Sequence, residues 1–341
     1  MKKTLALLLA LMLVLSCFAG CGAAEEAAPA EEAAEEVVEE VAEEAEEAPA
    51  VSANLTMGTG GESGTYYAFG GVLASYISTN TGIAVNVVST GGTTANIAGI
   101  DEGTYDLATV QSDVSTYAYM GTNSFEETGA VTSFSVLGAL YAETVQIVTC
   151  DPEITSVADL EGKSVCVGDV GSGTYYNTVD VLAAYGLTID DITPVYQSFG
   201  DSTESIKDGK IDAAFTVAGA PTTAIVDYAT TNELNLVSLS ADELAKVTAE
   251  YPFLVQDDLA AGTYSGQDDV VTCVAVQAAL VADKTVSEDV VYELTKAIYE
   301  NQADLTAGHA KWGLLSLKTA LDNTAPMHPG AEKYYKEVGA L

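Results

Sequence analysis

One run of hydroxyl-bearing residues around a glycine occurs twice in the sequence. Ser63–Tyr67 and Ser172–Tyr176 both read Ser-Gly-Thr-Tyr-Tyr, 109 residues apart. Each run follows a strand-like stretch and leads into a predicted helix. Glycine lets the backbone approach a ligand, and the first turn of a helix offers unpaired N–H groups with a partial positive charge. The pattern therefore predicts two turns that hold an anion.

A second repeated segment indicates two similar lobes. Glu102–Asp106 matches Asp208–Asp212, 106 residues later, and an apolar strand follows each copy. Two matches at nearly one offset predict an α/β fold of two lobes, which face one another across a cleft and close on a small molecule. We expect lobe 1 to comprise residues 52–145 and 275–341, and lobe 2 residues 146–274.

The strands that precede these turns decide where a ligand would lie, because ligands of open α/β sheets bind beyond the carboxyl ends of strands. In lobe 1 the polar loops 59–67, 89–96 and 111–113 each follow a predicted strand, and the runs 168–176 and 218–221 do so in lobe 2. We predict that ligand-binding residues come from these loops: Thr59, Ser63, Thr65, Tyr66, Thr90, Thr93, Thr94, Asn96, Gln111, Ser172, Gly173, Thr174, Tyr175, Ala218 and Pro221.

Some of these side chains have a second interpretation as helix caps or core residues. Four lie where a helix is predicted to start, and side-chain oxygens cap free N–H groups there: Thr90, Thr93, Thr94 and Asn96. Asp113 is interpreted as an N-cap, since a carboxylate would repel an anion, whereas Gln111 could reach a ligand. One tyrosine of each Tyr-Tyr pair is expected to pack in the core.

The charge of the chain excludes one class of partner. The formal net charge is −38, and all 12 basic side chains are lysines, because the sequence contains no arginine. No basic patch can neutralise phosphates, so we expect no nucleic-acid partner. Without a guanidinium, an anion must be held by backbone N–H groups, hydroxyls, amides or a lysine.

The N-terminal residues indicate export. Residues 1–21 have the basic start and short apolar run of a secretion signal, and Phe18–Cys21 is similar to the lipobox of bacterial lipoproteins. We expect Cys21 to carry a lipid that anchors the protein to the outer face of the cell membrane without spanning it, or a location in the periplasm. A plain cleaved signal peptide is the alternative. Residues 22–51, rich in Ala and Glu, are interpreted as an extended spacer.

The C-terminal part gives weaker signals. Residues 240–269 are acidic and are interpreted as irregular. Helices are predicted at about 287–305, 311–322 and 331–337.

Enzymatic chemistry has little support in the sequence, and we expect no enzyme, cofactor or metal site. The chain has two histidines, His309 and His328, and no Gly-x-Ser-x-Gly elbow or metal-ligand spacing. The acidic pairs at 257–258 and 268–269 are interpreted as solvated loop charge rather than calcium ligands. Three cysteines lie in or at the end of apolar strands and are predicted to be buried thiols: Cys150, Cys166 and Cys273.

Five segments in order resemble solute-binding proteins of the TAXI type, which serve TRAP (tripartite ATP-independent periplasmic) transporters. They are GTGGESGTYYAFGG, STGGTTANI, EGTYDLATVQSDV, VADLEGKSVCVGDVGSGT and MHPGAEKYYKEVG, within residues 52–341. The resemblance implies a two-lobed periplasmic-binding-protein-like fold (type II) with a hinge. It also implies a receptor that binds a small organic anion (an acidic amino acid, a dicarboxylate or a 2-oxo acid) and delivers it to a TRAP-type permease.

Two other interpretations stay open. The chain could be the substrate-binding lipoprotein of an ABC importer, which the same fold would serve. It could also be a surface adhesin or interaction module on an acidic stalk, which the anchor and spacer fit but the repeated turn does not. We expect a monomer.

Overall fold

The computed structural model describes residues 51–318 and 325–341, which belong to one compact unit. The predicted signal peptide, Cys21 and the spacer up to residue 50 lie outside the described residues. Within the described ranges, no helix combines the length and the apolar character needed to cross a membrane.

Strands and helices alternate along most of the chain. The strands are β1 Ser52–Gly58, β2 Gly82–Val88, β3 Leu107–Gln111, β4 Phe134–Thr149, β5 Ser164–Cys166, β6 Thr193–Val195, β7 Ala213–Ala218, β8 Asn235–Leu236, β9 Val255–Leu259 and β10 Val271–Asp283. The helices are α1 Thr65–Asn80, α2 Thr93–Asp101, α3 Ser112–Met120, α4 Thr174–Ala184, α5 Phe199–Lys207, α6 Thr223–Ala229, α7 Ala241–Glu250, α8 Glu288–Glu300, α9 Gln302–Gly308 and α10 Pro329–Glu337.

The described strands pair in the order β2-β1-β3-β10-β4-β7-β5-β6, with β8 on β4 and β9 on β10. Strand β1 is parallel to β2 and β3, and β5 is parallel to β6 and β7. The long strands β4 and β10 are antiparallel to each other and to their outer neighbours β7 and β3. Two parallel βαβ groups are therefore joined by one antiparallel pair, and the predicted α/β fold class is confirmed.

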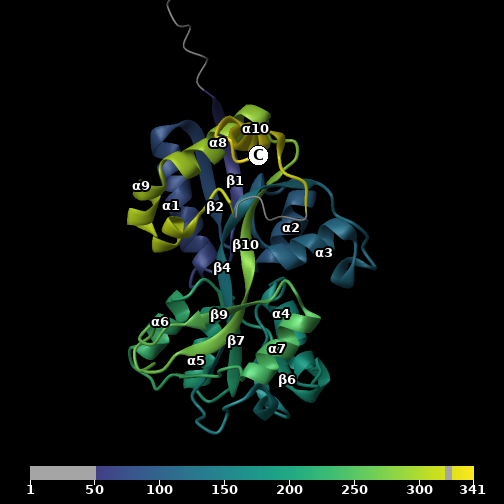
Figure 1. Ribbon diagram of the computed structural model, residues 1–341, viewed down its shortest axis with the longest axis vertical. Coiled ribbons are helices and arrows are strands. Elements are labelled where there is room, and N and C mark those ends of the chain that lie inside the picture. The colour runs from purple at the N-terminus through teal and green to yellow at the C-terminus, as the bar shows by residue number, and fades with distance from the viewer. Residues whose placement is uncertain (1–50, 319–324) are drawn as a thin grey trace, which may run out of the picture. The chain divides into compact units, whose positions relative to one another are not determined.

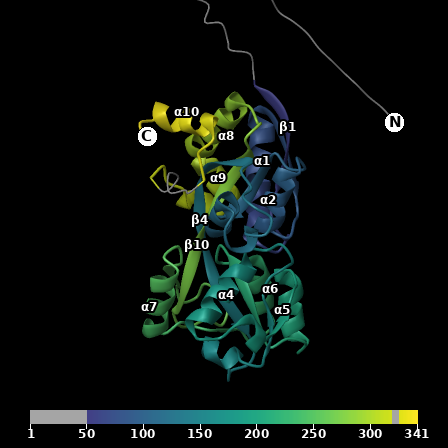
Figure 2. The ribbon, with the colours of Figure 1, turned by 90° about the vertical axis from the view of Figure 1, so that its right-hand side faces the viewer.

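Strands β4 and β10 run between two halves that have separate cores. Figures 1 and 2 show helices α1–α3 and α8–α10 around one end of this strand pair and α4–α7 around the other. Along β4, residues up to Tyr141 pack in the core of the first half, and residues from Val145 pack in the second. Along β10 the change falls between Val276 and Ala278. The lobe division at 145 and 275 stays a prediction, and it lies within a few residues of these points.

Helix α1 is held in place by an aromatic stack. Phe69 lies on Trp312, with ring centroids 3.7 Å apart and planes at 13°, and it also meets the edge of Tyr141 at 4.9 Å. All three rings are almost fully buried. Because residues three apart share a helix face, this packing also directs Tyr66 inward.

The C-terminal predictions need two corrections. Residues 240–269 are not wholly irregular, since they contain α7 and β9. The Ser240 hydroxyl accepts from the Glu243 N–H while the Glu243 carboxylate accepts from Ser240, and this capping box starts α7. The predicted helix 311–322 is wrong over its described part, where a single 3-10 turn, Ala310–Leu314, turns Trp312 into the core.

The cysteine prediction is confirmed for two residues and wrong for the third. Cys166 and Cys273 are buried free thiols, whereas Cys150 is exposed. Cys150 follows the last residue of β4, where the strand leaves the core for solvent.

Candidate functional site

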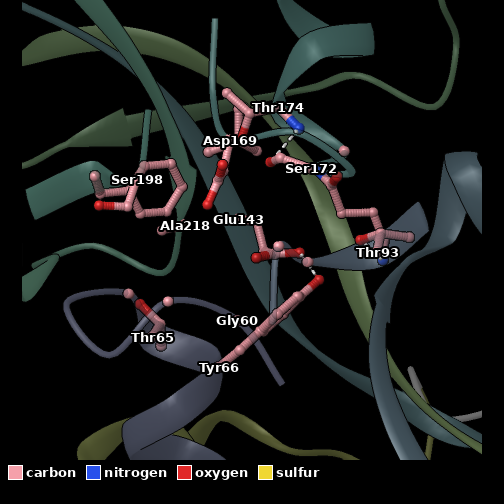
Figure 3. A pocket seen from close by; sticks show the side chains of 18 of the residues that line it. Gly60, Thr65, Tyr66, Thr93, Glu143, Asp169, Ser172, Thr174, Ser198 and Ala218 are labelled. Carbon is pink, nitrogen blue, oxygen red and sulfur yellow. Dashed lines mark hydrogen bonds between the residues drawn. The ribbon is translucent and has the colours of Figure 1, made fainter. Parts of the chain in front are cut away.

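A cavity lies where the two halves meet, with a volume of about 530 Å³ that includes the solvent at its mouth. Both halves contribute to its wall, as Figure 3 shows. The first half supplies the start of α1, the loop before α2 and the end of β3. The second half supplies the loop before α4, the start of α5 and the end of β7. The lining residues are Gly60, Gly61, Gly64, Thr65, Tyr66, Thr90, Gly91, Gly92, Thr93, Gln111, Glu143, Asp169, Ser172, Gly173, Thr174, Ser198, Phe199, Val217 and Ala218.

Helix α1 begins at Thr65, with Gly64 at its N-cap and no side chain capping it. Its first turn therefore presents backbone N–H groups, and Gly64, Thr65 and Tyr66 face the cavity. The Thr65 hydroxyl donates to the Gly219 carbonyl of the second half over 2.8 Å. This bond ties the start of α1 to the facing wall.

Helix α4 begins at Thr174, after Gly173. The Ser172 hydroxyl accepts from the Thr174 N–H over 3.1 Å. Gly173 approaches the first half so closely that a Cβ built on it would lie 1.4 Å from Gln111 Oε1. Any other residue here would displace Gln111, which accounts for the glycine.

Several hydrogen bonds join the halves around the cavity. The Thr94 and Ala95 N–H groups donate to the Gly171 carbonyl over 2.9 and 3.3 Å. The Gln111 amide donates to Asn177 Oδ1 over 2.8 Å. These bonds hold the halves in a closed arrangement.

A buried carboxyl forms the floor of the cavity. Glu143 lies on β4 and is 2% exposed, and the Tyr66 hydroxyl donates to its Oε2 over 2.5 Å (Figure 3). Burial raises the pKa of Glu143 well above its usual range, and the bond from Tyr66 offsets this only in part. Asp169, in the loop before α4, is the other carboxylate in the lining. No lysine lines this cavity among the described residues.

Two further acids are buried beside the site. Asp113 accepts from the Asn177 amide over 2.8 Å, and burial raises its pKa to about 6. Burial and the neighbouring Asp113 raise the pKa of Asp180 to about 7. Asp113 is the second residue of α3 rather than its N-cap, which is Gln111, so the N-cap prediction is wrong.

The structure brings most of the predicted ligand-binding residues to this one cavity. Those that line it are Thr65, Tyr66, Thr90, Thr93, Gln111, Ser172, Gly173, Thr174 and Ala218. Those that do not are Thr59, Ser63, Thr94, Asn96, Tyr175 and Pro221.

Hydrogen bonds within the protein account for two of the residues outside the lining. The Asn96 amide donates to the carbonyls of Thr59 and Thr109 over 2.6 and 2.7 Å, and its oxygen accepts from Thr90. The Thr59 hydroxyl donates to the Val88 carbonyl over 2.7 Å. Both side chains therefore brace the loops rather than face the cavity.

The other four lie around the outside of the cavity. Thr94 and Tyr175 line a separate surface hollow with Tyr176 and Tyr196. The Ser63 carbonyl accepts from Ala224 N–H over 3.1 Å, and Pro221 is exposed.

Sequence reasoning missed five side chains of the lining: Glu143, Asp169, Ser198, Phe199 and Val217. Glu143 carried a detectable signal, because it is the only charged residue in the 16-residue strand β4. Ser198 caps α5 by accepting from the Asp201 N–H, a pattern that the sequence also shows. No group of three or more potential metal ligands occurs in the described part of the chain.

Comparisons with known proteins place the chain in a family. Among solved structures, the chain is similar to the periplasmic aliphatic sulphonate-binding protein SsuA of Escherichia coli, with 14% identity, 84% of each chain covered and a TM-score of 0.45. It is also similar to a putative L-cystine ABC transporter protein of Listeria monocytogenes, with 16% identity, 77% of this chain and 96% of that chain covered, and a TM-score of 0.47. A model of the NMT1-like family matches residues 57–339, which include both halves and the whole cavity lining, and the chain therefore belongs to the NMT1-like family.

Proposed function

We propose that this protein is an extracytoplasmic receptor that binds a small organic solute between its halves and delivers it to a membrane permease. One observation carries the proposal: a single cavity is lined by the starts of α1 and α4 from opposite halves, and hydrogen bonds across the halves close it. A binding protein that closes on its ligand needs this arrangement.

The solute in this proposal carries a carboxylate, as the sequence predicts. The first turns of α1 and α4 offer backbone N–H groups, and the Thr93 and Thr174 hydroxyls lie beside them, whereas the Thr65 hydroxyl donates to the Gly219 carbonyl. The chain acts as a monomer without a cofactor, held at the membrane by the lipid on Cys21.

The permease is of the TRAP type that the resemblance implies, with an ABC importer as the second candidate. The energy source separates them, because an ABC importer hydrolyses ATP whereas a TRAP-type importer uses an ion gradient. Uptake of labelled solute by cells that produce this chain should stop when an ionophore collapses the gradient while ATP is maintained. Uptake that survives the ionophore and stops on ATP depletion would assign the ABC class.

The histidines support a receptor rather than an enzyme. The Nδ1 atom of His328 accepts from the Gly330 N–H, and its Nε2 lies 3.1 Å from the Val286 carbonyl. His309 accepts from the Lys311 N–H. Neither histidine lines the cavity, so neither can serve a nucleophile there.

A thermal-shift panel of amino acids, 2-oxo acids, 2-hydroxy acids and dicarboxylates tests the proposal. A solute that binds only the native state stabilises it by about 2.7 kcal/mol at 100 times its Kd, which raises the unfolding midpoint by a few degrees. Thr174→Val, which removes a hydroxyl from the lining, should reduce the shift. If no compound raises the midpoint of the wild type, while a purified protein or polysaccharide does, the adhesin interpretation replaces the receptor.

A further inference from the structure

The ionisable side chains around the cavity are unusual for a site that is expected to hold an anion. Glu143 and Asp169 line it, and no lysine does so within the described part of the chain. The sequence contains no arginine that could be brought in. A dicarboxylate would therefore place its second charge against two carboxyl groups without a cation to offset it.

Glu143 is held where a solute can reach it. The carboxyl is 2% exposed, and the Tyr66 hydroxyl is its only hydrogen-bond donor among the described residues. Tyr66 contacts Oε2, so the carboxyl keeps acceptor capacity on Oε1. Figure 3 shows the carboxyl between Tyr66 and the upper wall that carries Asp169 and Thr174.

Four charged or titratable groups act on Glu143, and none of them forms an ion pair with it. Tyr66 and Tyr141 are neutral phenols whose pKa values are raised by burial, and Asp113 is a like charge. Lys311 is the cation that acts on Glu143; it lies over the Tyr141 ring, with Nζ 6.0 Å from the centroid. Its charge lowers the pKa of Glu143, but burial lowers the pKa of Lys311 itself, and no ion pair joins the two side chains. Within the described residues the Glu143 carboxyl therefore has no ion-pair partner that would keep it ionised, and a cation that enters the cavity can pair with its ionised form.

Resting on the function proposed above, we propose that the solute is an amine-bearing monocarboxylate and that Glu143 determines this specificity. The ammonium group donates to Glu143, and the single carboxylate accepts from the N–H and hydroxyl groups at the starts of α1 and α4. Dicarboxylates and 2-oxo acids without an amine are rejected, because they offer Glu143 no cation, and a dicarboxylate also meets Asp169 with a second negative charge.

Binding of an amine-bearing solute changes the protonation of Glu143. Burial raises the pKa of Glu143, which favours the protonated carboxyl when no solute is bound. An ammonium ion beside Glu143 favours the ionised form of its carboxyl. The solute binds with its amine already protonated, and Glu143 releases its own proton to solvent. Binding of an amine-bearing solute should therefore release up to one proton, whereas binding of an anion to the neutral acid should release none.

Matched pairs of compounds test the assignment by isothermal titration calorimetry. Each pair has one carbon skeleton with an amine or an oxygen at the same carbon: alanine against lactate and pyruvate, and serine against glycerate. Glutamate and 2-oxoglutarate are included as dicarboxylates, and both should bind weakly. Binding is measured for the wild type, Glu143→Gln and the control Glu62→Gln. Glu62 is exposed in the loop before α1 and does not line the cavity, so the control removes one charge nearby without touching the site.

We expect the amine member of at least one pair to bind and its oxygen counterparts to bind at least about 30-fold more weakly. Glu143→Gln should weaken the amine compound by a similar factor, and Glu62→Gln by less than about threefold. Glutamine keeps an acceptor for Tyr66, so the variant should unfold within a few degrees of the wild type without solute. The measured heat of binding should change with the protonation enthalpy of the buffer, because the proton that Glu143 releases is taken up by the buffer.

The outcomes separate this inference from the function on which it rests. A dicarboxylate or 2-oxo acid that binds best, or an amine compound that binds Glu143→Gln as well as the wild type, would overturn the specificity and leave the receptor intact. If no solute of the panel binds the wild type, the receptor proposal and this inference both fall.

Discussion

Replacing Asp113 by asparagine should change how the stability of the protein responds to pH. Asp113 is 3% exposed at the interface of the halves, where its Oδ2 accepts from the Asn177 amide and its Oδ1 has no hydrogen-bond partner. Burial raises the pKa of its carboxyl from 3.8 to about 6. The native state therefore holds this proton more tightly than the unfolded chain does. The resulting stability is complete below pH 3.8 and is lost as the pH rises through about 6.

The size of the effect follows from the two pKa values. A difference of about 2.2 pKa units is worth about 3 kcal/mol at pH 8, where both forms are ionised. At pH 5 the native carboxyl is still mostly protonated, and the free energy of unfolding is about 1.6 kcal/mol lower than at very low pH. About 1.4 kcal/mol more is therefore lost between pH 5 and pH 8. Asparagine removes this loss and keeps an oxygen that accepts from Asn177.

Urea unfolding at pH 5 and pH 8 measures this difference. The probe is the fluorescence of Trp312, the only tryptophan, which is buried against Phe69. The gain in unfolding free energy from Asp113→Asn should be about 1.4 kcal/mol larger at pH 8 than at pH 5. The exposed Asp258→Asn is the control and should show no such difference. Equal gains at both pH values for Asp113→Asn would refute the argument that this carboxyl titrates in a buried environment.

Two other predictions concern the interface and the thiols. Gly173→Ala should weaken binding of a solute found in the panel by about 10-fold, because the new Cβ takes the place of Gln111 Oε1 and breaks the hydrogen bond from Gln111 to Asn177. Adding Gln111→Ala removes the clash and should restore part of the lost affinity, which calorimetry measures. Iodoacetamide should label Cys150 in the native protein before the two buried cysteines of the described residues, which peptide mass spectrometry can follow. Equal labelling of all three would contradict the burial seen here.

Local signals were enough to predict the frame of the cavity. Glycine followed by a hydroxyl residue and an apolar pattern marks the starts of α1 and α4, and both helices begin at the expected threonine, Thr65 and Thr174. Because strand ends of parallel groups meet at one edge, polar loops far apart in the chain could be expected to converge. The structure shows this convergence for most of the predicted residues.

Roles that depend on tertiary contacts could not be read from the sequence. Asn96 looks like a cap or a ligand contact, yet its amide donates to the carbonyls of Thr59, just after β1, and of Thr109 in β3, which lie next to it only in the folded protein. Glu143 sits in an apolar strand, and its direction depends on where β4 passes from one core to the other. The single charge within this apolar strand was a clue that the sequence offered. Nothing in the sequence indicated that Tyr66, 77 residues away, would be its hydrogen-bond partner.

The buried acids make solute binding and closure depend on pH in opposite directions. Asp113 and Asp180 lie where the halves meet, and their raised pKa values favour the closed arrangement at low pH, when both are neutral. Glu143 lies in the cavity, and in our proposal it must lose its proton to receive an ammonium group, which high pH favours. A receptor built in this way binds best between the two limits. That follows from the position of each buried carboxyl rather than from the total charge of the chain, because burial is the largest cause of all three raised pKa values.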